Sequence, residues 1–189
     1  MLNKKYVGDY RLENKENKKG KVVTKAVYKS AYFVFEKPEE EVKNAVRAVT
    51  VLTAAAAVAF AVAIVFYSNK GFSAQYYTLI PFALCVFPLL YLCFAVYALN
   101  KFMRGAEHRA TREQKDKMYE RLAKSSFIIM LLSGWNICGI ILAFILKIAG
   151  QEARPVTTND IIFAIMSIIF FTSAVLSFSF RKKVSMRQE

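Results

Sequence analysis

Charged side chains are missing from four long stretches of the sequence. Residues 48–67, 76–99, 127–146 and 161–180 contain no Asp, Glu, Lys or Arg, although such residues make up 22% of the 189-residue chain. Each stretch reaches the roughly 20 residues that a helix needs to cross a bilayer. Lipid leaves helices and closed barrels as the spanning structures, and barrel strands would alternate in polarity, which these runs do not. The sequence therefore predicts an all-α integral membrane protein with four transmembrane helices and excludes a soluble domain.

The sequence is also poor in residues that carry chemistry. It has one His and three Cys, with no CxxC pair, no HExxH and no GxGxxG, GxxxxGK[ST] or GxSxG motif. All three cysteines, Cys85, Cys93 and Cys138, fall inside apolar runs, where thiols usually behave as small buried hydrophobes. We therefore predict no catalytic residue, no metal site and no cofactor.

Asp, Glu, Lys, Arg and His, which mark ion pathways when they lie within membrane spans, are absent from the four runs. Asn136 is the most polar side chain expected at mid-membrane depth, and we predict that it faces the bundle interior towards the alanine-rich first span. Its amide serves either helix packing or a polar pathway. The residues assigned to this packing or pathway site are Asn136, Ser133, Gly134, Gly139, Ala143 and Pro88. Pro88 is expected to kink the second span.

Basic residues are distributed very unevenly between the hydrophilic segments. Of the 27 Lys and Arg residues, 12 lie in residues 1–47, eight in 100–126 and four in 181–189, which leaves three for the two other loops. The positive-inside rule therefore predicts that both termini are cytoplasmic, and we expect the cell membrane as the location. The basic residues predicted to lie at the membrane surface are Arg47, Lys101, Arg104, Lys124, Arg181, Lys182 and Lys183.

Three regions follow from these boundaries: an N-terminal cytoplasmic segment 1–37, a transmembrane domain 38–180 and a basic tail 181–189. A polar run ending in Gly20 separates two β-prone flanks of the first segment, which predicts a surface hairpin, although an amphipathic helix is the alternative. Pro38 is expected to start a helix that continues into the first span. Residues 111–114 (TREQ) form a capping-box pattern and predict that the third span extends into the helical loop 100–126. Asp160 is expected to cap the fourth span.

These features favour a non-enzymatic membrane protein, a subunit or adaptor that engages a protein partner or anionic lipid through its basic cytoplasmic face. A small oligomeric transporter or channel that uses Asn136 and Pro88 is the second hypothesis, and an integral enzyme acting on lipid is the third. A homo-oligomer is compatible with each of them. The net charge of +13 is explained by topology and lipid attraction, so we predict no binding of nucleic acid.

Overall fold

The computed structural model describes residues 4–16, 22–67, 71–105, 109–150 and 156–189. Helices dominate it: α1 (Glu39–Val65), α2 (Tyr76–Leu84), α3 (Val86–Arg104), α4 (Arg112–Lys115), α5 (Arg121–Ile148) and α6 (Thr158–Phe180). A π-helical segment, η3 (Asp116–Glu120), joins α4 to α5. When α2–α3 and α4–η3–α5 are each counted as one continuous rod, the long helices form four rods. Each rod is long and apolar enough to cross a membrane. The four predicted spans are therefore present as helices.

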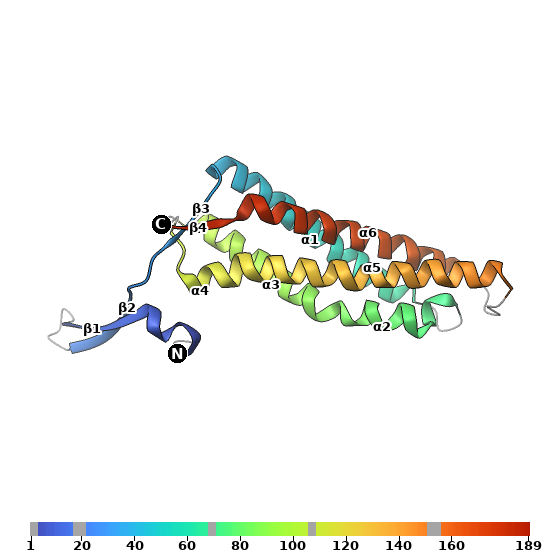
Figure 1. Ribbon diagram of the computed structural model, residues 1–189, viewed down its shortest axis with the longest axis horizontal. Coiled ribbons are helices and arrows are strands. Elements are labelled where there is room, and N and C mark those ends of the chain that lie inside the picture. Colours follow the sequence, from blue (N-terminus) through green and yellow to red (C-terminus); the bar gives the residue numbers. More distant parts are fainter. Residues whose placement is uncertain (1–3, 17–21, 68–70, 106–108, 151–155) are drawn as a thin grey trace.

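The four rods form one elongated bundle (Figure 1). In this bundle α1 packs on α6 and α3, and α5 packs on α6 and on the α2–α3 rod. The interior is filled by aliphatic and aromatic side chains from all four rods, among them Val49, Phe60, Leu92, Ile129 and Phe170. Phe60 stacks on Phe82 with ring centroids 4.6 Å apart, which joins the first rod to the second.

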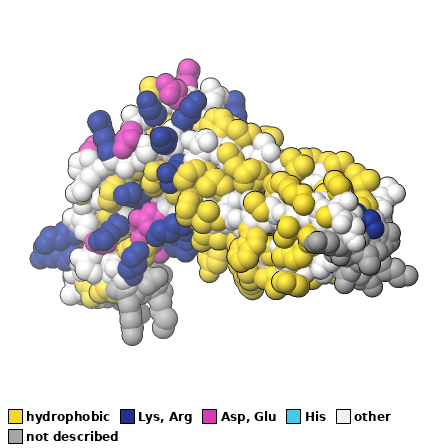
Figure 2. Space-filling model, turned by 45° about the vertical axis from the view of Figure 1, so that its right-hand side comes forward, with side chains coloured by type: hydrophobic (Ala, Val, Ile, Leu, Met, Phe, Trp, Pro, Cys, Tyr) yellow, Lys and Arg dark blue, Asp and Glu magenta, His cyan; other side chains and the backbone are white. Residues whose placement is uncertain are grey.

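The flanks of the bundle are apolar as well as its core. In an apolar stretch of 18 residues taken from each rod, only 33% of the residues are buried inside the protein, or 44% in the α2–α3 rod. Large side chains such as Val65, Phe94 and Ile148 point outward. Figure 2 shows hydrophobic side chains over the bundle flank, with most of the visible Lys, Arg, Asp and Glu side chains at one end. Water would be a poor solvent for such a surface, as expected of a multi-pass membrane protein.

Pro88 interrupts the second rod near its middle. A proline has no backbone N–H to donate to the carbonyl four residues earlier, and here the helix breaks at Cys85, which separates α2 from α3. The Cys85 N–H bonds to the Phe82 carbonyl in a tighter turn. The rod changes direction between α2 and α3 (Figure 1), so the predicted kink is confirmed. Pro81 lies inside α2.

The third span begins well before its apolar run, as predicted. Thr111 and Gln114 form the expected capping box, and the pairs Glu113–Lys117 and Glu120–Lys124 are present at 2.6 and 3.2 Å. The π-turn was not predicted: the Arg121 N–H bonds to the Asp116 carbonyl, five residues back. Met118 and Leu122, an apolar pair on this extension, are buried against the chain's own core, so they form no exposed apolar stripe for a partner helix.

The N-terminal segment contains the predicted hairpin, and the amphipathic helix considered as its alternative is wrong. After a 3₁₀ turn, η1 (Lys4–Asp9), strand β1 (Tyr10–Glu16) pairs antiparallel with β2 (Val22–Tyr28). The proposed turn at residues 17–20 lies outside the described residues. The hairpin projects beyond the helix ends (Figure 1), not along the apolar flank.

A second small sheet joins the two ends of the chain. Strand β3 (Phe33–Phe35) pairs antiparallel with β4 (Met186–Gln188), and β4 follows a 3₁₀ turn, η4 (Arg181–Val184). The tail 181–189, which the sequence indicates only as basic, is thus folded against the N-terminal segment. Both chain ends lie at the same end of the bundle (Figure 1).

Candidate functional site

The end of the bundle that carries both chain ends is a folded surface, which we call the terminal platform (residues 33–36, 109–111 and 184–189). Phe33 and Ala110 exchange two backbone hydrogen bonds of 2.8 Å, so the chain before α4 joins the β3–β4 pair. The Glu189 N–H donates to the Tyr32 carbonyl at 2.9 Å. Three segments far apart in the sequence therefore form one surface.

The terminal platform is fixed to the helices by its own small core. Ala110, Val184 and Met186 are buried, and the Phe35 ring meets the Phe102 ring of α3 at 5.9 Å in an edge-on arrangement. The Lys115 ammonium lies 4.3 Å from the centroid of the Phe33 ring, a favourable cation–π contact. Because these contacts reach α3 and α4, the platform moves with the bundle.

The hairpin is anchored beside the platform through η1. The Tyr6 ring is buried, and its hydroxyl donates to Asp116 Oδ2 at 2.7 Å, while Lys5 Nζ lies 2.6 Å from the same oxygen. Burial and the Asp116 hydrogen bond raise the pKa of Tyr6. The hydrogen bond to Asp116 likewise raises the pKa of Lys5. Both groups therefore keep their protons at neutral pH and hold the hairpin on the π-turn.

Two further contacts secure the strand that leaves the hairpin. Ser30 Oγ donates to Asp9 Oδ1 at 2.8 Å. The Tyr28 hydroxyl donates to the Ala31 carbonyl at 2.9 Å and accepts the Arg112 N–H at 3.1 Å. Tyr28 thus links β2 to the start of α4. These bonds give the hairpin, which would be marginal alone, a fixed direction relative to the bundle.

The register of the hairpin divides its side chains between two faces, and the first three pairs on one of these faces are uncharged. The pairs Tyr10–Tyr28, Leu12–Ala26 and Asn14–Thr24 share one face, because residues opposite each other on antiparallel strands point the same way. Leu12 is 69% exposed at the centre of this face. Arg11 and Glu13 lie on the other face. We call the first of these the Leu12 face.

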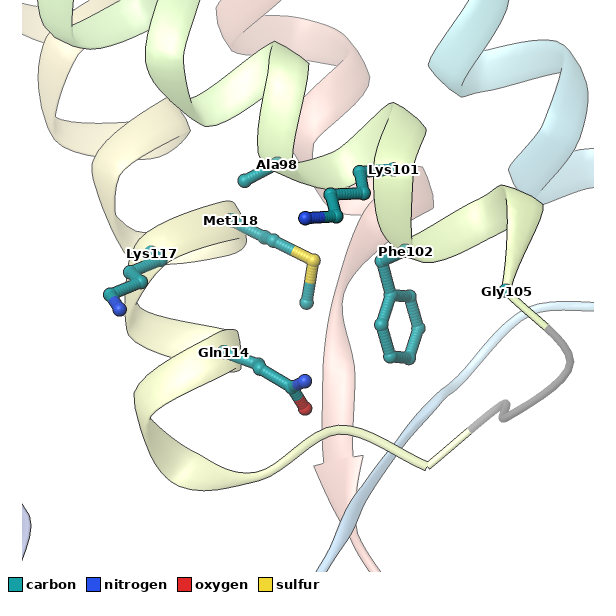
Figure 3. Close-up of a pocket in the computed structure, with 7 residues that line it drawn as sticks. All are labelled: Ala98, Lys101, Phe102, Gly105, Gln114, Lys117 and Met118. Carbon is teal, nitrogen blue, oxygen red and sulfur yellow. The ribbon is translucent and has the colours of Figure 1, made fainter.

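A groove lies between the end of α3 and the α4–η3 segment, and we call it the interfacial groove. It has a volume of about 540 Å³ and is drawn in Figure 3. Its main lining residues are Ala98, Lys101, Phe102, Gln114, Lys117 and Met118. The Lys101 ammonium and the Gln114 amide point into the space beside Met118 and Phe102, whereas the Lys117 ammonium turns away (Figure 3).

The polar groups that face this groove are donors. Gln114 Oε1 already accepts the Thr111 N–H at 2.8 Å, which leaves the Gln114 NH₂ group for the groove. Lys117 Nζ is held by Glu113 at 2.6 Å. Among the described residues, no carboxylate lies within ion-pair distance of Lys101. The groove therefore presents unneutralised positive charge and amide N–H groups next to an apolar wall.

The basic residues assigned to the membrane surface all lie at the platform end of their helices. Arg181 covers the Phe178 ring at 3.8 Å and Lys183 the Phe180 ring at 5.4 Å, and Lys124 pairs with Glu120. Of the basic residues assigned to the membrane surface, Lys101 lines the groove, whereas Arg47, Arg104 and Lys182 are exposed elsewhere. The structure thus brings Lys101 into the groove and places Lys124 and Arg181 beside a smaller pocket of about 300 Å³, and it leaves most of the others on the surface.

Asn136 is buried in the bundle, but it faces a different neighbour from the one predicted. Its Nδ2 donates to the Thr78 carbonyl of α2 at 2.8 Å, so the expected direction towards the first span is wrong. Within the described part of the chain its Oδ1 has no hydrogen-bond partner. The nearby Gly139 explains the approach: a Cβ there would lie 2.8 Å from the Tyr77 carbonyl oxygen, so only glycine lets α2 come this close.

The other residues assigned with Asn136 pack in different directions. Ser133 is buried and donates to the Ile129 carbonyl of its own helix at 2.5 Å. Gly134 faces α6, where an added Cβ would lie 3.4 Å from the Phe171 ring. Ala143 and Pro88 are buried. None of these residues lines the groove or the three other large pockets of the described residues.

The cysteines differ in exposure, which corrects the expectation of three buried thiols. Cys85 is buried, Cys93 is half-buried and Cys138 is exposed. Cys138 lies two residues after the buried Asn136, which is about 200° around a helix, so one of the two must face outward. The helical period was therefore the signal that could have placed it.

Asp160 takes part in the cap of α6, as expected, and it also binds a second turn, which the sequence did not reveal. Its carboxylate accepts from the Thr157 N–H and hydroxyl at 2.9 and 2.7 Å in a capping box in which Thr157 is the N-cap residue, and it also accepts from the Ser73 N–H at 3.1 Å. Ser73 belongs to a 3₁₀ turn, η2 (Phe72–Ala74). The side chain therefore ties the turn before α2 to the start of α6 at the end of the bundle opposite the platform.

Comparison of the chain with protein-family models, with curated proteins and with solved structures finds no match in any of the three. In the described residues, no three His, Cys, Asp or Glu side chains are grouped so as to hold a metal ion.

Proposed function

We propose that the chain is a multi-pass protein of the cell membrane with both termini in the cytoplasm. The basic residues concentrate in the segments that meet at the terminal platform, and such an excess marks the cytoplasmic side. Among the described residues, the opposite end of the bundle carries η2, the end of α5 and the start of α6. On this orientation, the folded extramembrane surface of the protein is offered to cytoplasmic partners.

The function that the geometry supports best is a non-enzymatic adaptor or subunit that docks a protein partner through its hairpin. The observation that carries this proposal is the anchored hairpin with its Leu12 face. Leu12 is 69% exposed, although Tyr6, Asp116 and Tyr28 hold the hairpin in one direction. A fixed strand pair with free outer edges in its described residues can accept a further strand. We therefore expect the partner to present an extended, uncharged segment.

The transporter and the enzyme remain weaker hypotheses for physical reasons. The four runs contain no Asp, Glu, Lys, Arg or His, and the Asn136 amide is already bonded to Thr78. A pathway needs polar groups along one continuous face, whereas Ser133 is bonded within its own helix. The extramembrane carboxylates Asp9 and Asp116 are engaged in anchoring the hairpin, and this occupation speaks against a catalytic role.

Site-specific photocrosslinking in cells tests the adaptor proposal. A photoreactive residue at position 12 should give one discrete adduct with another protein, and the same residue at position 11, on the charged face, should give little. Leu12→Glu should remove stoichiometric copurification of that protein, whereas the control Arg11→Gln should retain it. Equal adducts at both positions would contradict the proposal. An adduct with a second copy of the chain would show that the Leu12 face forms a homo-oligomer contact, and it would contradict the adaptor proposal.

A further inference from the structure

We propose that the interfacial groove binds the phosphate of an anionic phospholipid, with Lys101 and the Gln114 amide as donors and Phe102 and Met118 as the wall for the glycerol and upper acyl region. This inference rests on the membrane placement of the bundle and on the groove itself. It does not depend on the hairpin or on a protein partner.

The depth of the groove favours a lipid. The apolar run of the second span ends at residue 99, and Lys101 follows two residues later. Tyr97, one turn before Lys101, is 69% exposed, and amphipathic tyrosines of this kind are enriched at the level of the headgroups. The apolar flank of α3 therefore gives way to the groove at the depth where lipid phosphates lie.

The charge of the groove selects an anion. Lys101 has no carboxylate partner among the described residues, and its ammonium points into the space (Figure 3). The capping box uses the acceptor atom of Gln114 and turns the donor group towards the groove. An ammonium and an amide that line the same groove can each donate a charge-assisted hydrogen bond to the oxygens of one phosphate. A zwitterionic lipid would bring its own cation close to Lys101 and would bind less well.

The walls and the size of the groove suit an amphiphile more than a soluble anion. Ala98, Phe102 and Met118 supply an apolar side, which a free phosphate would leave unused. The volume of about 540 Å³ lies within the usual range of small-molecule sites, about 300–1,000 Å³. The occupant expected here therefore has an anionic head and an apolar body.

Native mass spectrometry of the purified full chain in a neutral detergent tests the proposal. We titrate phosphatidylglycerol or phosphatidylcholine and count the bound lipids. One phosphatidylglycerol should bind about tenfold more tightly than phosphatidylcholine. Lys101→Gln should weaken this first event about tenfold, the loss expected for one charge-assisted bond. Lys182→Gln, with the same change in charge outside the groove, should alter it less than twofold.

Gln114→Glu is the second variant, because a Glu at this position keeps the capping box while it replaces the donor by a negative charge. It should abolish the first binding event without lowering the thermal stability. Equal losses in Lys101→Gln and Lys182→Gln would overturn the proposal in favour of diffuse surface attraction. Displacement of the lipid by millimolar inorganic phosphate would overturn the lipid assignment, since the groove would then be a site for soluble phosphate. None of these lipid-binding results involves the Leu12 face. The adaptor proposal is therefore tested independently, by the crosslinking experiment at positions 11 and 12.

Discussion

The contact between α5 and α2 depends on Gly139, and replacing it by alanine should destabilise the bundle. A Cβ at this position would lie 2.8 Å from the Tyr77 carbonyl oxygen and 3.0 Å from Thr78 Cγ2. The first atom belongs to the backbone, so α2 itself must move. Overpacking of this kind costs about 1–3 kcal/mol. The movement also stretches the 2.8 Å bond from Asn136 to the Thr78 carbonyl, worth about 0.6–2 kcal/mol in a membrane.

Gly134→Ala is the matched control in the same helix. Its Cβ would lie 3.4 Å from the Phe171 ring, which is ordinary contact, and it brings the same gain in helix propensity, up to about 1 kcal/mol. The difference between the two variants therefore isolates the steric effect. We expect Gly139→Ala to be less stable than Gly134→Ala by about 1–3 kcal/mol, which is roughly 2–12 °C in melting temperature for a chain of this size.

The assay is thermal unfolding in a mild detergent. Unfolding is monitored through the reaction of the buried Cys85 thiol with a fluorogenic maleimide. Cys93 and the exposed Cys138 are replaced by Ser in the reference protein, so that the signal reports opening of the α2–α3 rod. If both glycine variants melt together within about 1 °C, the close approach of α2 at Gly139 does not limit stability, and the account of this contact is refuted.

Four further predictions follow from the sequence and the structure together. Reporter fusions after positions 30, 110 and 189 should report the cytoplasm and fusions near 72 and 153 the outside, and a cytoplasmic signal at 72 would contradict the four-span orientation. Asn136→Leu should lower stability by about 1 kcal/mol without a charge-selective change in flux, measured in detergent and in proteoliposomes. Tyr6→Phe should speed hydrogen exchange in the hairpin but not in the bundle. Burial raises the pKa of Tyr6 and the Asp116 bond that of Lys5, so wild-type hairpin docking should persist at neutral pH and weaken as the pH rises above about 10.

Local signals in the sequence predicted the features that depend on neighbouring residues. The four spans follow from length and hydropathy, and the capping box at Thr111 follows from a Gln three residues later. The break before Pro88 follows from its missing N–H. Each of these features is decided within one or two helical turns, so no knowledge of tertiary contacts was needed.

The orientation of each helix about its axis is harder to predict, because lipid and protein core are both apolar. In α5 the buried positions include Ile129, Ser133, Asn136, Gly139 and Ala143, at steps of three or four residues. These interior residues are mostly small or polar, as is usual where membrane helices meet closely. Hydropathy alone does not reveal that face, which is why Cys138 was expected inside and the partner of Asn136 was assigned to the wrong helix.

The terminal platform illustrates a structure that follows from helix packing and not from its own sequence. Strands β3 and β4 have three residues each, too few for a recognisable pattern. Yet β3 ends shortly before α1, β4 begins shortly after α6, and α1 packs along α6. Packing of the two helices therefore brings the strands together through short connections, and the remaining loop-closure entropy is small. Once α1 and α6 are known to be neighbours, the pairing of Phe35 with Met186 is the expected way to satisfy the backbone groups of both chain ends.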